Sequence, residues 1–262
     1  NHQPKTYFMT SQQMVSDNIQ RAPKVVNKAQ SDAVAVYAIV RATLGSVSLD
    51  VGARHEDIDG EVRNDMTGET VERSQSLTSP SVSAIWELSD TLSVFGGLYE
   101  GFSPAGPGSD ASNEESTNYE LGVRFSHQAT EASLVGFFSD YGNLIGRCRV
   151  SDTTCEPGSE FNGGEVEISG VELLLIHAIA LSDTLSLEGS LAYTYTESEF
   201  ATTFLSGFPQ WGLVKEGDEL PYIPESVGNA RLGLVGERWR IEGSVDFQSQ
   251  MREVPGVADI ED

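Results

Sequence analysis

Apolar and polar residues alternate in the first part of the segment 116–145. Every second residue from position 119 to position 125 is apolar, while the residues between them are charged or glycine. Because successive side chains of a strand point to opposite faces, this pattern predicts a strand with one apolar and one polar face. Residues 128–130 then predict a turn, and a run rich in small, aromatic and β-branched residues follows. The segment is therefore expected to form a β-hairpin.

Similar runs predict eight further strands, so that ten are expected in all. Residues 1–32 are mostly polar and predict a long loop, with a short helix near residues 12–20. Residues 55–79 carry many acidic side chains and predict a second long loop. The eight further strands are expected over residues 33–44, 47–54, 82–88, 92–102, 166–179, 185–195, 227–235 and 239–248.

Short turns and long loops alternate along this series of strands. The sequence L-S-D-T-L-S occurs at residues 88–93 and again at 181–186, on two of the short turns. An up-and-down outer-membrane barrel has this asymmetry, because its turns on one side are short and its loops on the other side are long. A β-sandwich shows the same alternation of side chains but mixes short and long connections at both ends.

In such a barrel the apolar face of each strand points to lipid and the polar face points inward. The later strands separate the two kinds of residue, which favours the barrel because acidic side chains on a lipid face are costly. The residues expected to face lipid are Leu187, Leu191, Tyr193, Val245 and Phe247. The residues expected to line the inside are Glu188, Ser190, Thr194, Glu242, Ser244, Asp246 and Gln248.

Five ordered motifs carry a resemblance to a known family. They are G-G-L-Y-E-G-F-S-P from residue 96, N-Y-E-L-G-V-R from residue 118, F-F-S-D-Y-G-N-L-I from residue 137, F-N-G-G-E-V-E-I-S-G-V-E from residue 161 and L-P-Y-I-P-E-S from residue 220. Over residues 33–250 the chain resembles the barrel of TonB-dependent outer-membrane receptors. It is most similar to the iron-chelate receptors, the ferric-citrate type among them.

The resemblance implies an all-β fold, an antiparallel up-and-down transmembrane β-barrel. The family's plug domain, energy-coupling box and terminal aromatic residue have no counterpart in these 262 residues, so a partial barrel of about ten strands is expected. Residues 1–262 would form part of one barrel domain, with 1–32 an outward loop, 33–250 the strands and loops, and 251–262 the start of a further loop. The implied location is the outer membrane of a Gram-negative bacterium.

The same resemblance implies a function and partners. Receptors of this kind import a scarce ferric chelate, such as a siderophore or ferric citrate. The TonB energy-coupling complex would act on this protein through the plug, and outer-membrane lipid would surround the barrel.

Composition changes this picture only a little. The net charge is -24, from 16 basic and 40 acidic residues, and such an acidic chain argues against binding nucleic acid. The acidic surface suits either the binding of cations or simple solubility. No apolar run reaches the 18 or so residues of a membrane-spanning helix, but transmembrane strands need only about 9–11.

Catalytic chemistry is not expected. The four histidines are scattered, none at the spacing of a helical metal pair, and neither a nucleophile elbow nor a phosphate-binding glycine loop occurs. The sequence therefore predicts no enzyme, no cofactor and no metal site.

Ligand binding is expected to depend on arginines, because a negatively charged iron chelate suits the fixed fork of guanidinium donors. The alternative is that each arginine neutralises neighbouring carboxylates. Aromatic residues in the long loops could contact the apolar part of a ligand or could anchor the loop. The candidates are Arg54, Arg124, Arg147, Arg149 and Trp211.

The only two cysteines, Cys148 and Cys155, stand seven positions apart in a polar stretch. Exported proteins meet an oxidising environment, so a disulfide that closes a short exposed loop is expected. A zinc site is disfavoured because no histidine lies nearby.

Two other classes of protein stay open on the sequence. One is a passive porin or an adhesin barrel. The other is a soluble, secreted β-sandwich that binds carbohydrate or calcium through acidic loops. For a receptor, cobalamin or an oligosaccharide could replace the ferric chelate as cargo.

Overall fold

The computed structural model describes residues 27–148, 159–208 and 210–257. These residues form strands joined by turns and loops, with no helix among them. Within this part of the chain, no helix is long and apolar enough to cross a membrane. The helix expected near residues 12–20 lies outside the described residues.

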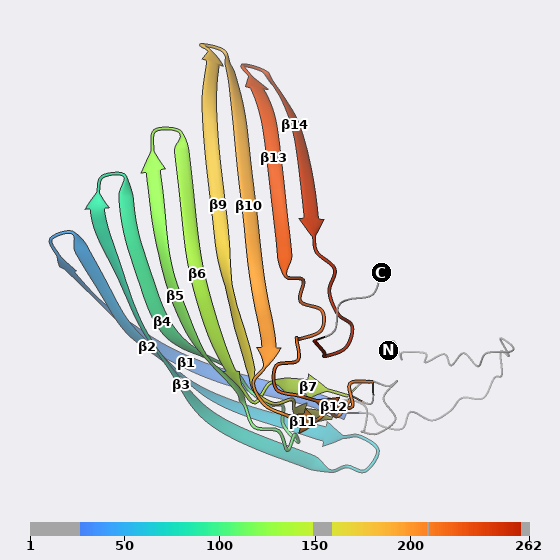
Figure 1. Ribbon diagram of the computed structural model, residues 1–262. Helices are drawn as coiled ribbons and strands as arrows, with labels where there is room; N and C mark the ends of the chain where they lie inside the picture. The colour runs from blue at the N-terminus through green and yellow to red at the C-terminus, as the bar shows by residue number, and fades with distance from the viewer. Residues whose placement is uncertain (1–26, 149–158, 209, 258–262) are drawn as a thin grey trace, which may run out of the picture.

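Ten strands form one antiparallel sheet in which every strand pairs with the strand before and after it in sheet order (Figure 1). Among the described residues no connection crosses another strand, so the predicted up-and-down arrangement is confirmed, and a two-sheet sandwich is excluded. The sheet curves around an open inner side, and β1 and β14 form its two edges in the described part of the chain. The strands are β1 (Asn27–Leu44), β2 (Val47–Asn64), β3 (Thr70–Ser89), β4 (Leu92–Ser103), β5 (Glu114–His127), β6 (Thr130–Gly142), β9 (Val166–Ser182), β10 (Leu185–Phe200), β13 (Ser226–Gly236) and β14 (Trp239–Gln248).

Two-residue turns join the strands at one end of the sheet, which we call the short-turn end. In the first of these turns Gly45 has a φ of 62°, a conformation that glycine adopts without steric cost. The tips of the hairpins rise stepwise from β1–β2 to β9–β10 (Figure 1). The opposite end carries the longer connections, which contain two small hairpins. These are β7 (Ile145–Arg147) with β8 (Glu160–Asn162), and β11 (Phe204–Leu205) with β12 (Leu213–Val214).

The prediction of a long loop at residues 55–79 is wrong, because β2 and β3 continue through this segment and leave only residues 65–69 as a connection. Residues 27–32 likewise belong to β1 and not to a loop. β3 has 20 residues, roughly twice the 9–11 that a membrane-spanning strand needs. The first three strands therefore project beyond the membrane, where charged side chains meet water while the backbone keeps its ladder of hydrogen bonds.

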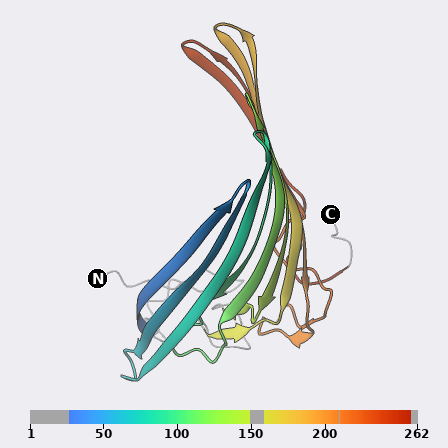
Figure 2. The ribbon, with the colours of Figure 1, turned by 90° about the vertical axis from the view of Figure 1, so that its left-hand side faces the viewer.

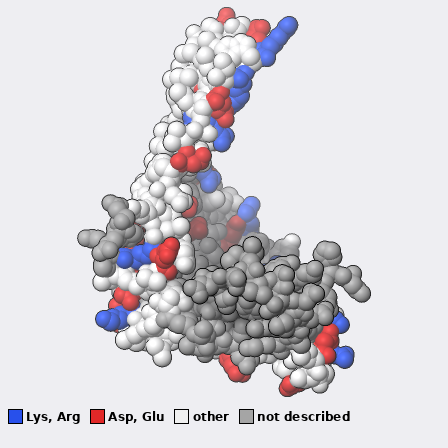
Figure 3. All heavy atoms as spheres, turned by 90° about the vertical axis from the view of Figure 1, so that its right-hand side faces the viewer, with Lys and Arg blue, Asp and Glu red and all other residues white. Residues whose placement is uncertain are grey.

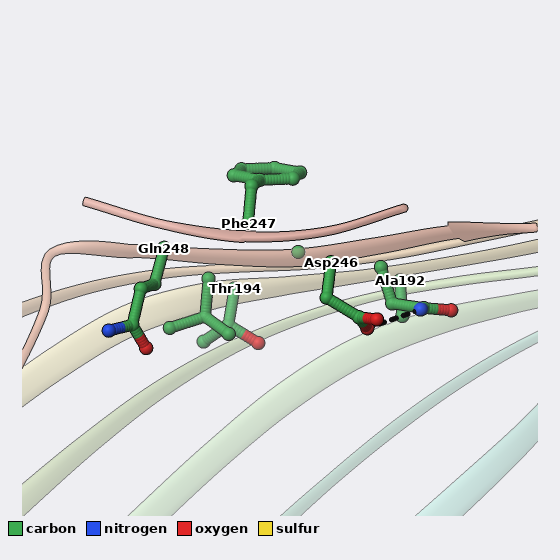
Figure 4. Close-up of a pocket in the computed structure, with 8 residues that line it drawn as sticks. Ala192, Thr194, Asp246, Phe247 and Gln248 are labelled. Carbon is green, nitrogen blue, oxygen red and sulfur yellow. Dashed lines mark hydrogen bonds between the residues drawn. The ribbon is translucent and has the colours of Figure 1, made fainter. Parts of the chain in front are cut away.

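The two faces of the sheet differ as expected. Phe247 points to one side of β14, while Thr194, Asp246 and Gln248 point to the other side, toward the space that the strands curve around (Figure 4). Directly paired residues share a face, so the register extends this assignment to the neighbouring strands. The outer face is apolar and exposed: the exposed fraction is 70% for Val40 and 67% for Leu121. Lipid contact explains this exposure, which would be unfavourable in water.

The buried hydrophobic side chains of the described residues gather at the long-loop end. Val166, Phe200, Val214 and Leu220 form a hydrophobic cluster with exposed fractions of 8% or less. Figure 2 shows this end of the sheet carrying the irregular segments, while the hairpin tips at the other end stand free. The sheet itself has no buried centre of this kind among the described residues, as expected for a single layer with lipid on one side and an open inner side on the other.

Candidate functional site: the loop layer and the inner wall

Two surfaces are in a position to meet a ligand. The first is the loop layer, which we define as residues 104–113, 143–148, 159–165, 201–208, 210–225 and 249–257. The second is the inner wall, the concave face of the ten-stranded sheet (Figure 2).

Aromatic rings hold the loop layer together around its buried cluster. Trp211 lies with its ring centroid 6.1 Å from Phe200 and 5.0 Å from Phe208. Phe208 in turn makes an edge-to-face contact with Phe161 of β8, at 5.1 Å. These contacts join the β11–β12 connection to β8 and to the end of β10. In this arrangement Trp211 anchors the loop.

Glu160 is the central polar group of the loop layer. It accepts hydrogen bonds from the backbone amide of Gly106 at 2.8 Å and from Nη2 of Arg147 at 2.5 Å. Its side chain is only 8% exposed. Burial raises the pKa of Glu160, but the hydrogen bonds from Arg147 and Gly106 outweigh burial and leave the pKa below its ordinary value. The carboxylate therefore stays charged and ties β7, β8 and residues 104–113 together.

Further hydrogen bonds fix residues 104–113 between β8 and the projecting part of β3. The amide of Ser112 donates to Oδ1 of Asn162 at 2.9 Å. Arg73 of β3 donates to the carbonyl oxygens of Ser109 and Ala111, at 3.0 and 3.1 Å. The loop layer and the projecting strands thus form one connected body.

The predicted ligand-binding residues are spread over both surfaces. Arg147 and Trp211 lie in the loop layer. Arg54 lies on β2 and pairs with Glu56 on the same strand. Arg124 lies on β5 near the short-turn end, where its guanidinium carbon stands 5.1 Å from the ring centroid of Phe95. Arg149 lies outside the described residues.

The inner wall carries a network of charges at the short-turn end. Arg240 of β14 donates to Glu188 of β10 at 3.0 Å and to Glu242 at 2.6 Å. Arg231 of β13 lies 3.4 Å from Glu242. In the space-filling view, basic and acidic atoms stand side by side along this part of the protein (Figure 3). The inner wall therefore offers several guanidinium groups, although the chain as a whole is acidic.

A shallow hollow of about 410 Å³ lies along β10, β13 and β14 (Figure 4). Its inward polar groups are those of Thr194, Asn229, Asp246 and Gln248. Asn229 donates to Oδ1 of Asp246 at 2.6 Å, and the side chain of Asp246 points to the inner side (Figure 4).

The disulfide and the expected lack of a metal site both stay predictions. Cys148 is buried, with 3% exposed, but Cys155 lies outside the described residues, so the disulfide stays a prediction. Among the described residues, no group of three or more His, Cys, Asp or Glu side chains could hold a metal ion.

Sequence reasoning missed Glu160 and Phe95. Glu160 gains its importance from partners more than ten residues away in the chain, and Phe95 from its neighbour across the sheet. No local pattern marks either contact. The alternation of inward and outward side chains along β4 and β5 does predict that Phe95 and Arg124 face inward, but it does not predict that these two side chains contact each other.

The fold and the two faces of the sheet define a transmembrane barrel protein. A family model described as TonB dependent receptor-like, beta-barrel matches residues 4–258. The chain therefore belongs to the TonB-dependent receptor family. It is located in the outer membrane of Gram-negative bacteria, and members of the family are transporters and not enzymes.

Solved structures with a similar fold include several receptors for metal compounds. The unliganded ferric citrate transporter FecA matches with a TM-score of 0.66 and 19% identity, over 86% of this chain and 33% of that one. The siderophore receptor PiuA from Acinetobacter baumannii matches with a TM-score of 0.66 and 15% identity, over 85% and 34%. The copper transporter OprC matches with a TM-score of 0.60 and 16% identity, over 82% and 34%. The chain thus spans about a third of the length of these proteins.

Proposed function

We propose that this chain is part of the barrel of a TonB-dependent receptor that imports a ferric chelate, a siderophore or ferric citrate, across the outer membrane. The observation that carries the proposal is the set of inward guanidinium groups on a chain with a net charge of -24. Guanidinium groups suit an anionic iron chelate, because their planar fork of donors can form two parallel hydrogen bonds with one carboxylate. The similar structures of a ferric citrate transporter and a siderophore receptor support the same cargo.

In this proposal residues 1–262 belong to one barrel domain. The outward apolar face meets outer-membrane lipid. Energy for import comes from the TonB complex, acting through a plug domain that the matched barrel model does not include.

The ligand first meets the loop layer. Arg147 uses one N–H group on Glu160, yet its side chain is 70% exposed, so its other donors can reach a ligand. Arg54 is 52% exposed and has the same capacity on the inner side of the projecting strands. Arg149 and Trp211 complete the proposed capture residues, with Arg124 deeper on the inner wall.

Outer-membrane fractionation and iron uptake test this proposal. The complete gene is expressed in a host that lacks its own ferric citrate and siderophore receptors, and radioactive iron uptake is measured with each chelate. We expect uptake of one anionic chelate that depends on TonB. Membrane location without uptake of any ferric chelate would reject the cargo, while the fold would stand.

A matched pair of variants separates ligand capture from general charge. Arg147→Gln should weaken chelate binding at the cell surface about ten-fold, because a charge-assisted hydrogen bond of the ligand is lost. Lys215→Gln removes a positive charge elsewhere in the loop layer, from a side chain that makes no ion pair with the described residues, and should bind normally. Equal losses in both variants would show that only net charge matters.

A further inference from the structure

A second hollow, of about 270 Å³, lies on the outer face of the sheet, where β9, β10 and β13 run side by side (Figure 1). Phe247 points outward, and the residues paired with it across the sheet, Gly228 and Tyr193, share its face (Figure 4). Every second residue of a strand lies on the same face, so the odd-numbered residues of β10 near Tyr193 also point outward. The outward side chains that form the walls of the hollow are Leu175, Ile179, Leu187, Leu191 and Leu232.

Gly189 lies at the centre of this hollow. Leu187 and Leu191 flank it along β10. Its directly paired residues are His177 on β9 and Leu232 on β13. A Cβ added to Gly189 would stand 3.7 Å from Cδ1 of Leu232, an ordinary contact distance. The hollow therefore exists because the central position has no side chain.

Gly189 differs from the glycines of the sheet that make room for an aromatic ring. A Cβ added to Gly122 would overlap the ring of Phe95, and one added to Gly228 would overlap the ring of Phe247. Over Gly189, no ring of the described residues fills the corresponding space. Glycine inside a strand lowers stability, and it often marks a place where a ligand approaches the backbone closely. The space over Gly189 is thus suited to an occupant from outside the sheet.

His177 stands at the edge of the hollow toward β6. Its Nδ1 lies 2.8 Å from Oγ1 of Thr130, its direct partner on that strand. A polar group that faces lipid is costly unless it is hydrogen-bonded, and this contact satisfies the ring at Nδ1. The other walls are hydrocarbon. Because a bound water needs about two to four polar partners, the hollow suits an apolar occupant.

The outer face keeps this position in a complete barrel. A plug domain would lie in the lumen, on the opposite side of the sheet. Further strands would join at the edges, which are β1 and β14 in the described part of the chain, whereas β9, β10 and β13 lie inside the sheet. The hollow therefore faces the membrane whatever the inner wall contacts.

The position of the hollow along the strands indicates one leaflet of the membrane. Leu187 is the third residue of β10, which begins at the short turn with Leu185. Short turns lie on the periplasmic side of an outer-membrane barrel. The distance from Leu187 to Leu191 is roughly 13 Å along the strand, within the roughly 15 Å of hydrocarbon in one leaflet. The hollow therefore faces the periplasmic leaflet, which consists of phospholipids.

We propose that the hollow around Gly189 is a binding site for one acyl chain of a phospholipid of the periplasmic leaflet. Between apolar surfaces inside a membrane, preference comes from van der Waals packing and not from the hydrophobic effect. A chain in the hollow contacts the backbone of Gly189 and side chains on both sides, whereas a chain on a flat part of the outer face contacts protein on one side only. This inference goes beyond the proposed function, because it depends on the membrane location and not on the cargo.

The test uses the complete receptor purified in detergent. The probe is phosphatidylethanolamine with a diazirine in the middle of one acyl chain, which links to the protein atoms that it touches when it is illuminated. Mass spectrometry of peptides then identifies the labelled segments. We expect labelling of residues 173–179 and 185–191 that saturates as the probe is added and that unlabelled phosphatidylethanolamine reduces. Labelling elsewhere on the outer face should increase without saturation.

Three variants test whether the space over Gly189 matters. Gly189→Leu fills the hollow and should reduce the saturable labelling several-fold. Gly189→Ala adds a Cβ at an ordinary contact distance, so it should fold like the wild type and give a smaller reduction. Gly136→Leu is the matched control, because Gly136 is paired with the outward-facing Leu121 and lies outside the hollow. It should leave the saturable labelling unchanged.

Three results would overturn the proposal. Even labelling of the whole outer face, or saturable labelling that persists in Gly189→Leu, would show that the hollow does not bind a chain. Displacement of the probe by less lipid A than phosphatidylethanolamine would assign the hollow to lipopolysaccharide. A dimer in native mass spectrometry that is lost in Gly189→Leu and kept in Gly136→Leu would show that a second copy of the chain covers the hollow.

Discussion

The ring of Phe137 on β6 lies over Gly170, its direct partner on β9. A Cβ added to Gly170 would overlap the carbonyl oxygen of Tyr195 and would stand 2.6 Å from Cζ of Phe137, closer than two non-bonded carbon atoms can approach. The same relationship joins Phe95 to Gly122, Phe247 to Gly228 and Trp239 to Gly236. Glycine in these strands therefore provides room for an aromatic ring from the neighbouring strand.

This relationship predicts that Gly170→Val destabilises the sheet. The new side chain must displace both the carbonyl oxygen of Tyr195 and the ring of Phe137, and overpacking of this kind costs about 1–3 kcal/mol or more. The urea midpoint of barrel unfolding in detergent measures the effect. Gly243→Ala is the control, because an added Cβ there meets nothing within 4 Å. Similar midpoints for the two variants would contradict the argument.

The position of Glu160 predicts a pH dependence of the loop layer. Its pKa lies below the ordinary glutamate value of about 4.3, so its contacts stabilise the folded loop layer at higher pH. This stabilisation should disappear as the pH falls below that value and through the lowered pKa of the folded state. Trp211 fluorescence, with Trp86 and Trp239 replaced by Phe, can follow the change. Glu160→Gln should remove the transition, and a transition that persists in this variant would assign it to another group.

Trp211→Ala should loosen the loop layer while the sheet stays folded. The substitution removes ring contacts with Phe200 and Phe208, a loss on the order of 2 kcal/mol for a partly buried tryptophan. Limited proteolysis should cut residues 201–225 faster, and strand content by circular dichroism should not change. Leu213→Ala, in the same hairpin but 58% exposed, should leave proteolysis unchanged. Unfolding of the sheet in Trp211→Ala would contradict the prediction that the loop layer can loosen while the sheet stays folded.

Arg240→Gln should lower the thermal midpoint of unfolding at low salt. The variant leaves Glu188 and Glu242 close together on the inner wall without the shared cation. The decrease should be small, because these side chains are exposed, and it should shrink at high salt as the repulsion is screened. Arg238→Gln, which removes a charge from the adjacent turn, should have little effect. An Arg240 effect that does not depend on salt would indicate lost packing instead of lost charge.

The period-two pattern of the sequence predicted most of the sheet. It located ten strands, the short turns and the inner and outer faces of β10 and β14, because the two faces of each strand meet different solvents. The same reasoning failed at residues 55–79. The acidic residues there were assigned to a loop, whereas β2 and β3 keep their backbone hydrogen bonds in water. The inner face of these two strands packs against residues 104–113, for example where Pro107 lies next to Gly60.

The candidate site was harder to predict than the sheet. The arginines were chosen from charge and position alone, and the sequence could not show that Glu160 engages Arg147 or that Arg124 rests on Phe95. These contacts arise when strands or loops distant in the chain meet. Local sequence patterns carry no information on these contacts. The pairing of β4 with β5 places Arg124 next to Phe95, but this pairing is known only from the structure.

The order of the strands also has a consequence for assembly. The ten strands of the sheet lie side by side in the order in which they occur along the chain. Each hairpin can therefore form as soon as its own residues are available. A growing sheet of this kind adds one hairpin at a time to a single advancing edge. The slowest steps are then expected at the β6–β9 and β10–β13 junctions, because these two pairings have to wait for the long connections that contain β7 with β8 and β11 with β12.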